Sequence, residues 1–174
     1  NRDPSPPQRN SKIPDGSSLP ISQSISLKEQ VSFVDHTHTV TSVAFSADGK
    51  ILASGGMDTD VYLWETATTK RIRKISTPMT GINCVAFGPM GQPMAIGSRD
   101  LKIHLWDGKH LSLRFLGGHK DGTNALAFAY TAPLLASGSE DGTIKLWDLD
   151  TQIERRSFGG SAGRIFSLAF SPED

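Results

Sequence analysis

The three tryptophans of this 174-residue chain stand at a nearly fixed interval. Trp64, Trp106 and Trp147 are 42 and 41 residues apart, and they close three similar phrases, VYLW, IHLW and IKLW. A period of about forty residues indicates that one supersecondary unit has been repeated. Because such a unit cannot bury its apolar face alone, we expect the repeats to stack on one another.

Other columns of the sequence recur with the same period. The tetrapeptides SVAF, CVAF, ALAF and SLAF end at Phe45, Phe87, Phe128 and Phe170. An aspartate lies six residues before each tryptophan, at Asp58, Asp100 and Asp141. The agreement of independent columns indicates three complete repeats and the beginning of a fourth.

The third repeat shows most clearly what one unit contains. It has four short extended segments separated by turns rich in Gly, Asp, Ser and Pro, namely Ala125–Phe128, Leu134–Ser137, Thr143–Trp147 and Ile153–Phe158. Short strands at such spacing are typical of antiparallel meanders. No window shows sustained helical periodicity. The pattern therefore predicts an all-β fold with four strands in each unit.

The repeats resemble those of the WD40 family. The third repeat carries Gly118-His119 and then LLASGSEDGTIKLWD over residues 134–148. The first repeat has LASGGMD ending at Asp58, and the second has Trp106-Asp107. The resemblance extends over about residues 27–174 and implies a β-propeller, in which each blade is a four-stranded sheet around a central channel. The units run over about residues 36–75, 78–116, 119–158 and, in part, 161–174.

Three full blades with single strands on either side do not close a ring, since propellers have four to eight blades. Leu27–Val34 aligns with the last strand of a unit, and the chain stops just after the first strand of the fourth. An open array would leave unpaired strand edges. We therefore expect the remaining blades in a longer chain, most simply a seven-bladed propeller. Closure of one ring by two copies is the alternative.

The resemblance also implies a structural tetrad in two repeats, in which Trp, Ser, His and Asp form a chain of hydrogen bonds. The corresponding residues are His36, Ser54, Asp58 and Trp64 in the first repeat, and His119, Ser137, Asp141 and Trp147 in the third. The second repeat keeps Asp100 and Trp106 but has Pro78 and Ile96 at the other two positions. We expect apolar packing to hold that blade, because losing several partners together is tolerated better than losing one.

Composition limits the function classes and the compartment. Lys and Arg total 18 and Asp and Glu total 18, so no overall field favours nucleic acid or a membrane surface. No run of eighteen apolar residues is present. The single cysteine, Cys84, excludes an internal disulfide and fits a reducing, intracellular compartment, cytoplasmic or nuclear. Residues 1–26 are rich in Pro and Ser, which predicts a flexible linker or tail.

The sequence gives little support to a phosphate-binding, metal or catalytic site. The glycine-rich segment 117–123 lacks the Gly-Lys-Ser/Thr ending of a phosphate loop. His36 and His38 have no further Cys or His nearby, so we expect no metal. Aspartates that recur once per repeat indicate architecture, and no nucleophile motif is present. We therefore expect no cofactor and no enzyme activity, and we expect His104 and His110 to be surface residues.

Function is therefore expected to depend on surfaces. The resemblance implies that proteins or peptides bind on the rim formed by two sets of loops. Met and Arg are enriched in binding interfaces, which favours Met57 and Arg99 as contact residues. The further candidates are Glu140, His38, Lys120 and Asp121.

Two other roles remain open at this stage. One is the sensor propeller of a larger signalling protein, such as a nucleotide-binding NTPase, with residues 1–26 as an interdomain linker. The other is a ubiquitin-ligase substrate receptor, although the segments Trp106–Lys109 and Trp147–Asp150 lack the arginine of the Trp-Asp-x-Arg pattern of such receptors. Arg71, Arg73 and Lys74 on an expected outer strand are interpreted as solvated charges that protect a sheet edge.

Overall fold

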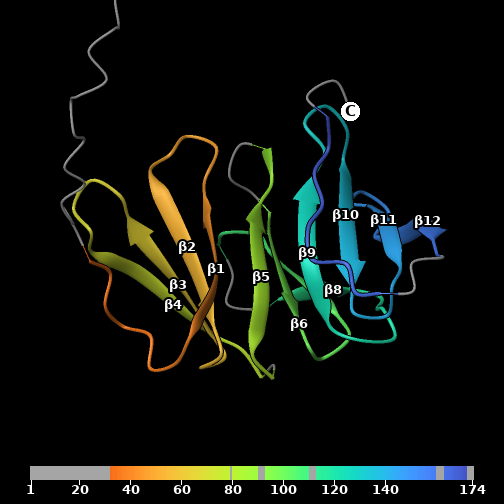
Figure 1. Ribbon diagram of the computed structural model, residues 1–174. Coiled ribbons are helices and arrows are strands. Elements are labelled where there is room, and N and C mark those ends of the chain that lie inside the picture. The colour runs from red at the N-terminus through yellow and green to blue at the C-terminus, as the bar shows by residue number, and fades with distance from the viewer. Residues whose placement is uncertain (1–31, 79, 90–92, 110–112, 160–162, 172–174) are drawn as a thin grey trace, which may run out of the picture. The chain divides into compact units, whose positions relative to one another are not determined.

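Every strand in the described part of the chain belongs to one of three four-stranded antiparallel sheets (Figure 1). The computed structural model describes residues 32–78, 80–89, 93–109, 113–159 and 163–171. These belong to a compact unit over residues 31–174, and the predicted linker at residues 1–26 lies outside the described residues. Helix is absent from the described ranges, so they contain none that could cross a membrane.

Each sheet is a meander whose strands pair in chain order. The first sheet contains β1 (Val40–Phe45), β2 (Ile51–Gly56), β3 (Asp60–Glu65) and β4 (Arg71–Ser76). The second contains β5 (Ile82–Phe87), β6 (Met94–Ser98), β7 (Ile103–Trp106) and β8 (Arg114–Leu116). The third contains β9 (Thr123–Phe128), β10 (Leu134–Ser139), β11 (Ile144–Asp148) and β12 (Ile153–Phe158). The prediction of four strands per unit is confirmed.

The meander topology determines which turns and loops lie at the same end of the sheets. Because successive strands are antiparallel, the turn after the second strand of each sheet lies at the same end as the loop that leads into the next sheet. We call this end the rim end. It contains the β2–β3, β6–β7 and β10–β11 turns and the β4–β5 and β8–β9 loops. The turns after the first and third strands lie at the opposite end. The first strands β1, β5 and β9 are neighbours (Figure 1).

Apolar side chains form a core between each pair of sheets. In β3, Val61 and Leu63 contribute to the core with the second sheet, whereas Tyr62 and Trp64 face the other way. This alternation follows from the two-residue period of a strand. Trp106 completes the first core and Trp147 the second, so the repeated tryptophan lies at the junction with the preceding sheet.

A periodic row of glycines allows the sheets to approach closely. A Cβ atom on Gly55 would lie 2.5 Å from Cγ2 of Ile82 in the next sheet. The same position in the second sheet, Gly97, would place a Cβ atom 2.9 Å from Cγ2 of Thr123. Real Cβ contacts essentially never fall below 3.0 Å. Only glycine therefore fits at this column, which the sequence analysis did not single out.

Cys84 lies in this junction and has a packing role. Its column is occupied by Ser42, Ala125 and Ser167 in the other repeats. The Cys84 thiol is buried and donates to the backbone carbonyl of Thr123 at 3.5 Å. Burial raises the pKa of this thiol to about 12, which leaves it protonated and unreactive.

The segments that flank the sheets contact them without joining a strand ladder. Residues 32–35 and 163–171 have no strand in the structure. Phe33 packs edge-on against Trp64 with ring centroids 5.3 Å apart, and Asp35 forms an ion pair with Arg71 at 2.9 Å. Ile165 donates its backbone N–H to Ser139. A strand needs a hydrogen-bonding partner along its length, which neither segment has among the described residues.

Candidate functional site

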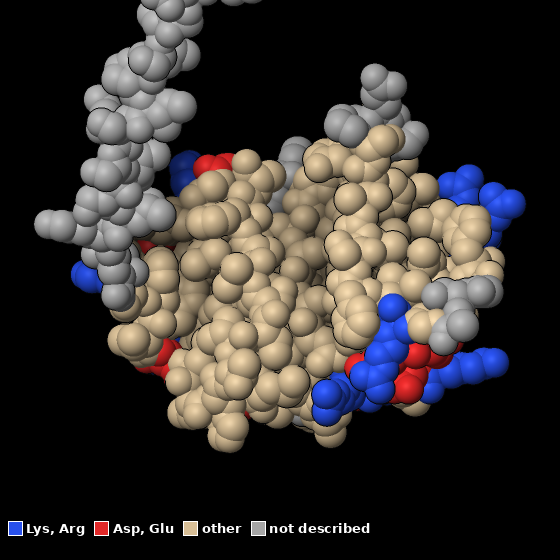
Figure 2. Space-filling view, viewed as in Figure 1, with Lys and Arg blue, Asp and Glu red and all other residues tan. Residues whose placement is uncertain are grey.

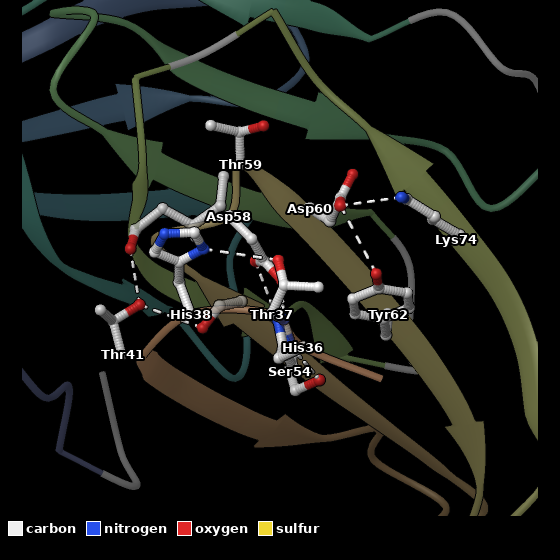
Figure 3. Close-up of polar contacts among 12 residues, drawn as sticks. His36, Thr37, His38, Thr41, Ser54, Asp58, Thr59, Asp60, Tyr62 and Lys74 are labelled. Carbon is white, nitrogen blue, oxygen red and sulfur yellow. Dashed lines mark hydrogen bonds and ion pairs between the residues drawn. The ribbon is translucent and has the colours of Figure 1, made fainter. Parts of the chain in front are cut away.

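The structure brings together the four tetrad residues of the first repeat at the rim end, and Figure 3 labels three of them, His36, Ser54 and Asp58. Trp64 donates from Nε1 to the hydroxyl of Ser54 at 2.9 Å. His36 lies 2.8 Å from the same hydroxyl through Nε2 and 2.9 Å from Asp58 through Nδ1. The network therefore links β3, β2 and the segment before β1 to the β2–β3 turn.

Asp58 also holds the segment before β1 through the backbone, because its Oδ2 accepts the N–H of Thr37 at 2.9 Å. Burial of the carboxylate favours protonation, but the hydrogen bonds from His36 and Thr37 outweigh it. Together they hold the pKa of Asp58 below its usual value.

The tetrad residues of the third repeat also meet, in a chain with one further member. Trp147 donates to Ser137 at 2.8 Å, and Ser137 lies 2.7 Å from Nε2 of His119. Nδ1 of His119 is 2.9 Å from the hydroxyl of Thr143 and 3.3 Å from Asp141. Thr143 donates in turn to Asp141 at 2.6 Å. The threonine hydroxyl thus lies between the histidine and the aspartate, which the tetrad pattern does not include.

Burial and hydrogen bonding shift both titratable groups of this network. Burial of His119 lowers the pKa of the imidazole, although the charge of Asp141 opposes that effect. Burial favours protonation of Asp141, but the hydrogen bonds from Thr143 and from the backbone N–H of Lys120 outweigh it and lower its pKa to about 2. The native network therefore contains a neutral histidine and an ionised aspartate.

These shifts predict that the protein loses stability in acid over two windows. The unfolded state takes up the His119 proton near pH 6.5 and the native state only at lower pH, so stability falls as pH decreases below 6.5. Asp141 contributes fully to the stability of the native state above pH 3.8, and this contribution is lost as pH falls from 3.8 towards about 2. Urea unfolding across pH should show both windows. In His119→Asn only the upper window should disappear; an unchanged slope there would contradict the assignment.

The second sheet replaces the tetrad with a different pair, and the expectation that His104 is a surface residue is wrong. His104 on β7 is buried and donates from Nε2 to Asp100 at 2.7 Å. Ser98 also donates to Asp100, at 2.6 Å. Burial favours protonation of Asp100, but Ser98 and His104 outweigh it and lower its pKa. His104 stands two residues before Trp106, on the same strand face, and this period was the signal available in the sequence. His110 lies outside the described residues.

The first sheet has a buried acid that sequence reasoning missed. Asp60 is 8% exposed and accepts an ion pair from Lys74 at 2.9 Å, with the Tyr62 hydroxyl 3.5 Å away (Figure 3). This pairing raises the pKa of Lys74. Lys74 was interpreted from the sequence as a solvated edge charge, whereas in the structure it bridges two neighbouring strands.

Two rim candidates occupy equivalent places at successive junctions between sheets. Met57 lies in the β2–β3 turn, and a Cβ atom on Gly81 would be 3.0 Å from its sulfur. Arg99 follows β6, and a Cβ atom on Gly122 would be 3.4 Å from its Cγ. Met57 is 37% exposed, and Arg99 is also exposed. Each residue therefore borders the loop that leads into the next sheet.

The other rim candidates lie at the same end but differ in how far their side chains are exposed. Glu140 is largely covered, with its side chain 13% exposed, and forms an ion pair with Arg164 at 3.2 Å. His38, Lys120 and Asp121 are exposed. The backbone N–H of Lys120 binds Asp141, and the Asp121 carbonyl accepts the hydroxyl of Ser139. The β8–β9 loop, which carries both residues, is thus held by the end of β10 and the β10–β11 turn.

The first strands carry an apolar groove on the face shown in Figure 2, which is largely uncharged. It has a volume of about 520 Å³, and its walls include the repeated phenylalanines Phe45, Phe87, Phe128 and Phe170. Phe45 is 63% exposed, whereas Phe128 is buried against the second sheet. Within the described ranges no cluster of three or more His, Cys, Asp or Glu residues is arranged to hold a metal ion.

Comparison with known proteins gives a family and a fold. The family model described as WD domain, G-beta repeat matches residues 27–65, 69–107 and 111–148. No curated protein matches the chain by sequence. Among solved structures 1186 chains match, so the likeness is too common to indicate one function.

Two of these structures are those of U3-55K and of the RRP9 WD40 repeats, each with a TM-score of 0.74 and 21% identity. The likeness covers 79% of this chain but 44% and 43% of theirs, so the chain spans less than half of their length. At this identity the likeness concerns the fold. The three matched ranges contain the tetrad positions and each described strand except β12, and the chain therefore belongs to the WD40 repeat family.

Proposed function

We propose that this chain acts as a non-catalytic scaffold that binds proteins or peptides at its rim end. Membership of the WD40 family supports a protein-interaction role in general. The rim contacts are our own assignment, with Met57 and Arg99 at the centre and His38, Lys120, Asp121 and Glu140 around them. We further propose an intracellular setting, because the one cysteine is buried and unreactive.

The observation that carries this proposal is the placement of Met57 and Arg99. Both are exposed at the same end, one junction apart, and both rest on a glycine of the next sheet's loop. Strands and short turns hold them, so a partner would bind a surface that needs little ordering. Methionine supplies adaptable apolar contact, and arginine supplies directional hydrogen bonds. Such residues are enriched at the centres of interfaces.

The test is a double substitution, Met57→Ala with Arg99→Ala, in the full-length protein. Proteins captured by the wild type should be identified by quantitative mass spectrometry, and their affinities measured one by one. If these residues are hot spots, we expect at least one partner to bind roughly tenfold more weakly.

A matched control comes from the opposite end of the sheets. Thr68 and Lys109 are exposed residues of the turns after β3 and β7. The variant with Thr68→Ala and Lys109→Ala should keep every partner's affinity. The rim proposal fails if all partners bind the Met57 and Arg99 variant as tightly as the wild type. It also fails if the control variant loses the same partners equally.

A further inference from the structure

A small pocket lies between the second and third sheets at the end opposite the rim. Its volume is about 320 Å³, and it is lined by Pro93, Leu105, Asp107, Arg114, Leu149 and Gln152. Pro93 precedes β6, and Leu149 and Gln152 belong to the turn between β11 and β12. The turns after first and third strands meet at this end, so the pocket shares no loop with Met57 or Arg99.

The floor of the pocket is apolar and continuous with the core. Leu105 is 6% exposed and belongs to the core between the second and third sheets, and Leu149 packs against that core from its edge. Pro93 adds a rigid wall whose carbonyl is held by the backbone N–H of Gly88 at 2.9 Å. A concave apolar floor with a few polar groups at its mouth is the usual form of a binding pocket. Its volume suits one apolar side chain and the backbone that carries it.

Arg114 sets the charge that a ligand would carry. It is exposed on β8, and no acidic residue in the described part of the chain lies within ion-pair distance of its guanidinium. Asp107, the acid of the same pocket, is engaged at Oδ1 by the backbone N–H of Lys109 at 2.9 Å. A guanidinium without an acid partner, beside an apolar floor, favours a carboxylate attached close to an apolar group.

The equivalent arginines of the other sheets have other partners. Arg114 pairs with Leu105 in the strand register, as Arg73 pairs with Leu63 in the first sheet and Arg156 with Leu146 in the third. The Arg73 guanidinium lies 5.4 Å from the ring centroid of Trp106, and that of Arg156 lies 5.2 Å from that of Phe158. Neither arginine lines the pocket. An arginine at this position therefore belongs to the repeat, whereas the apolar floor beside it belongs to this junction.

We propose that this pocket binds a short peptide segment in which an apolar side chain stands next to a carboxylate. The side chain would enter between Leu105 and Leu149, and the carboxylate would accept hydrogen bonds from Arg114. The Gln152 amide and the Asp107 carboxylate would engage the peptide backbone. The carboxylate can come from a chain terminus or from an Asp or Glu side chain.

The experiment uses labelled Gly/Ser peptides and the full-length protein. One peptide ends in leucine with a free carboxylate, one has an internal Leu-Asp and an amidated end, and one has leucine without any carboxylate. We expect the first or the second to bind, as measured by fluorescence anisotropy, and the third to bind more weakly. Binding by the first alone assigns a chain terminus, and binding by the second alone assigns an acidic side chain. Methyl resonances of Leu105 and Leu149 should shift on binding.

Arg114→Gln should weaken the binding peptide about tenfold, which is the loss expected for one charge-assisted contact. Arg156→Gln, the matched change in the third sheet, should leave the affinity unchanged. The proposal is overturned if no peptide binds, if the peptide without a carboxylate binds equally well, or if both arginine variants lose affinity equally. The variant with Met57→Ala and Arg99→Ala should bind the peptides normally, so failure of the rim proposal would leave this result intact.

Discussion

Replacing Gly118 by alanine should destabilise the protein by about 3 kcal/mol. A Cβ atom on Gly118 would lie 1.7 Å from the backbone oxygen of Leu101 in the β6–β7 turn. That oxygen cannot move like a side chain. Leu101 already has a left-handed φ of 69°, a region that costs an L residue about 1–2 kcal/mol. The turn is also held by Asp100, which accepts the backbone N–H of Lys102. The clash must therefore separate the loop from the turn.

The neighbouring glycine supplies the control. A Cβ atom on Gly117 would find its nearest neighbour, a Trp147 ring carbon, at 4.0 Å. Gly117→Ala should thus change the free energy of unfolding by less than about 0.5 kcal/mol, as surface substitutions usually do. Urea unfolding of the two variants measures the difference. Equal stabilities would mean that the loop shifts without cost and that the close approach is not a structural requirement.

The second large effect is expected from His119→Ala, which should cost about 3 kcal/mol through a cavity and broken hydrogen bonds. The His119 side chain is 0% exposed and lies between Ser137 and Thr143. Its removal leaves two hydroxyls without their partner in a buried site. A network of this kind loses more than the sum of its pairs when one member is deleted.

Pro78 occupies the histidine position of the second repeat and provides the comparison. It is exposed, so Pro78→Ala should cost less than about 1 kcal/mol, mainly through a more flexible unfolded chain. Adding Ser137→Ala to His119→Ala should cost much less than Ser137→Ala alone, because the serine has already lost a partner. Equal melting temperatures for the His119 and Pro78 variants would contradict the network's role, and strict additivity would contradict its cooperativity.

The difference between the sheets shows where repeat alignment stops being informative. The family resemblance and the column spacing together assign His36, Ser54, Asp58 and Trp64 to one network, because equivalent residues of a repeat occupy equivalent places. The same alignment treated Asp100 as a remnant of a lost network. In the structure His104 reaches it from β7. His104 occupies a different column of the repeat from the tetrad histidine, so an alignment of equivalent positions cannot find this pair.

Other contacts depend on which sheet follows which. Gly55 is required because Ile82 of the next sheet lies against it, and the ion pair of Asp60 exists because β4 places Lys74 beside β3. The pocket at Arg114 needs Leu149 from the third sheet. These residues are far apart in the chain, and a period read along it does not specify the side chains that meet across a junction.

The sequence by itself determined the repeat, the four-strand meander and the family, since these follow from local spacing and from side chains that alternate along each strand. Together with the family resemblance, it also indicated the members of both tetrads, because one geometry recurs with the period. Only the tertiary structure decided the Thr143 hydroxyl within the third network, the His104–Asp100 pair and the pocket beneath Arg114. The physical reason is that contact energies depend on distances between atoms of different strands and sheets, and those distances are set only when the sheets pack.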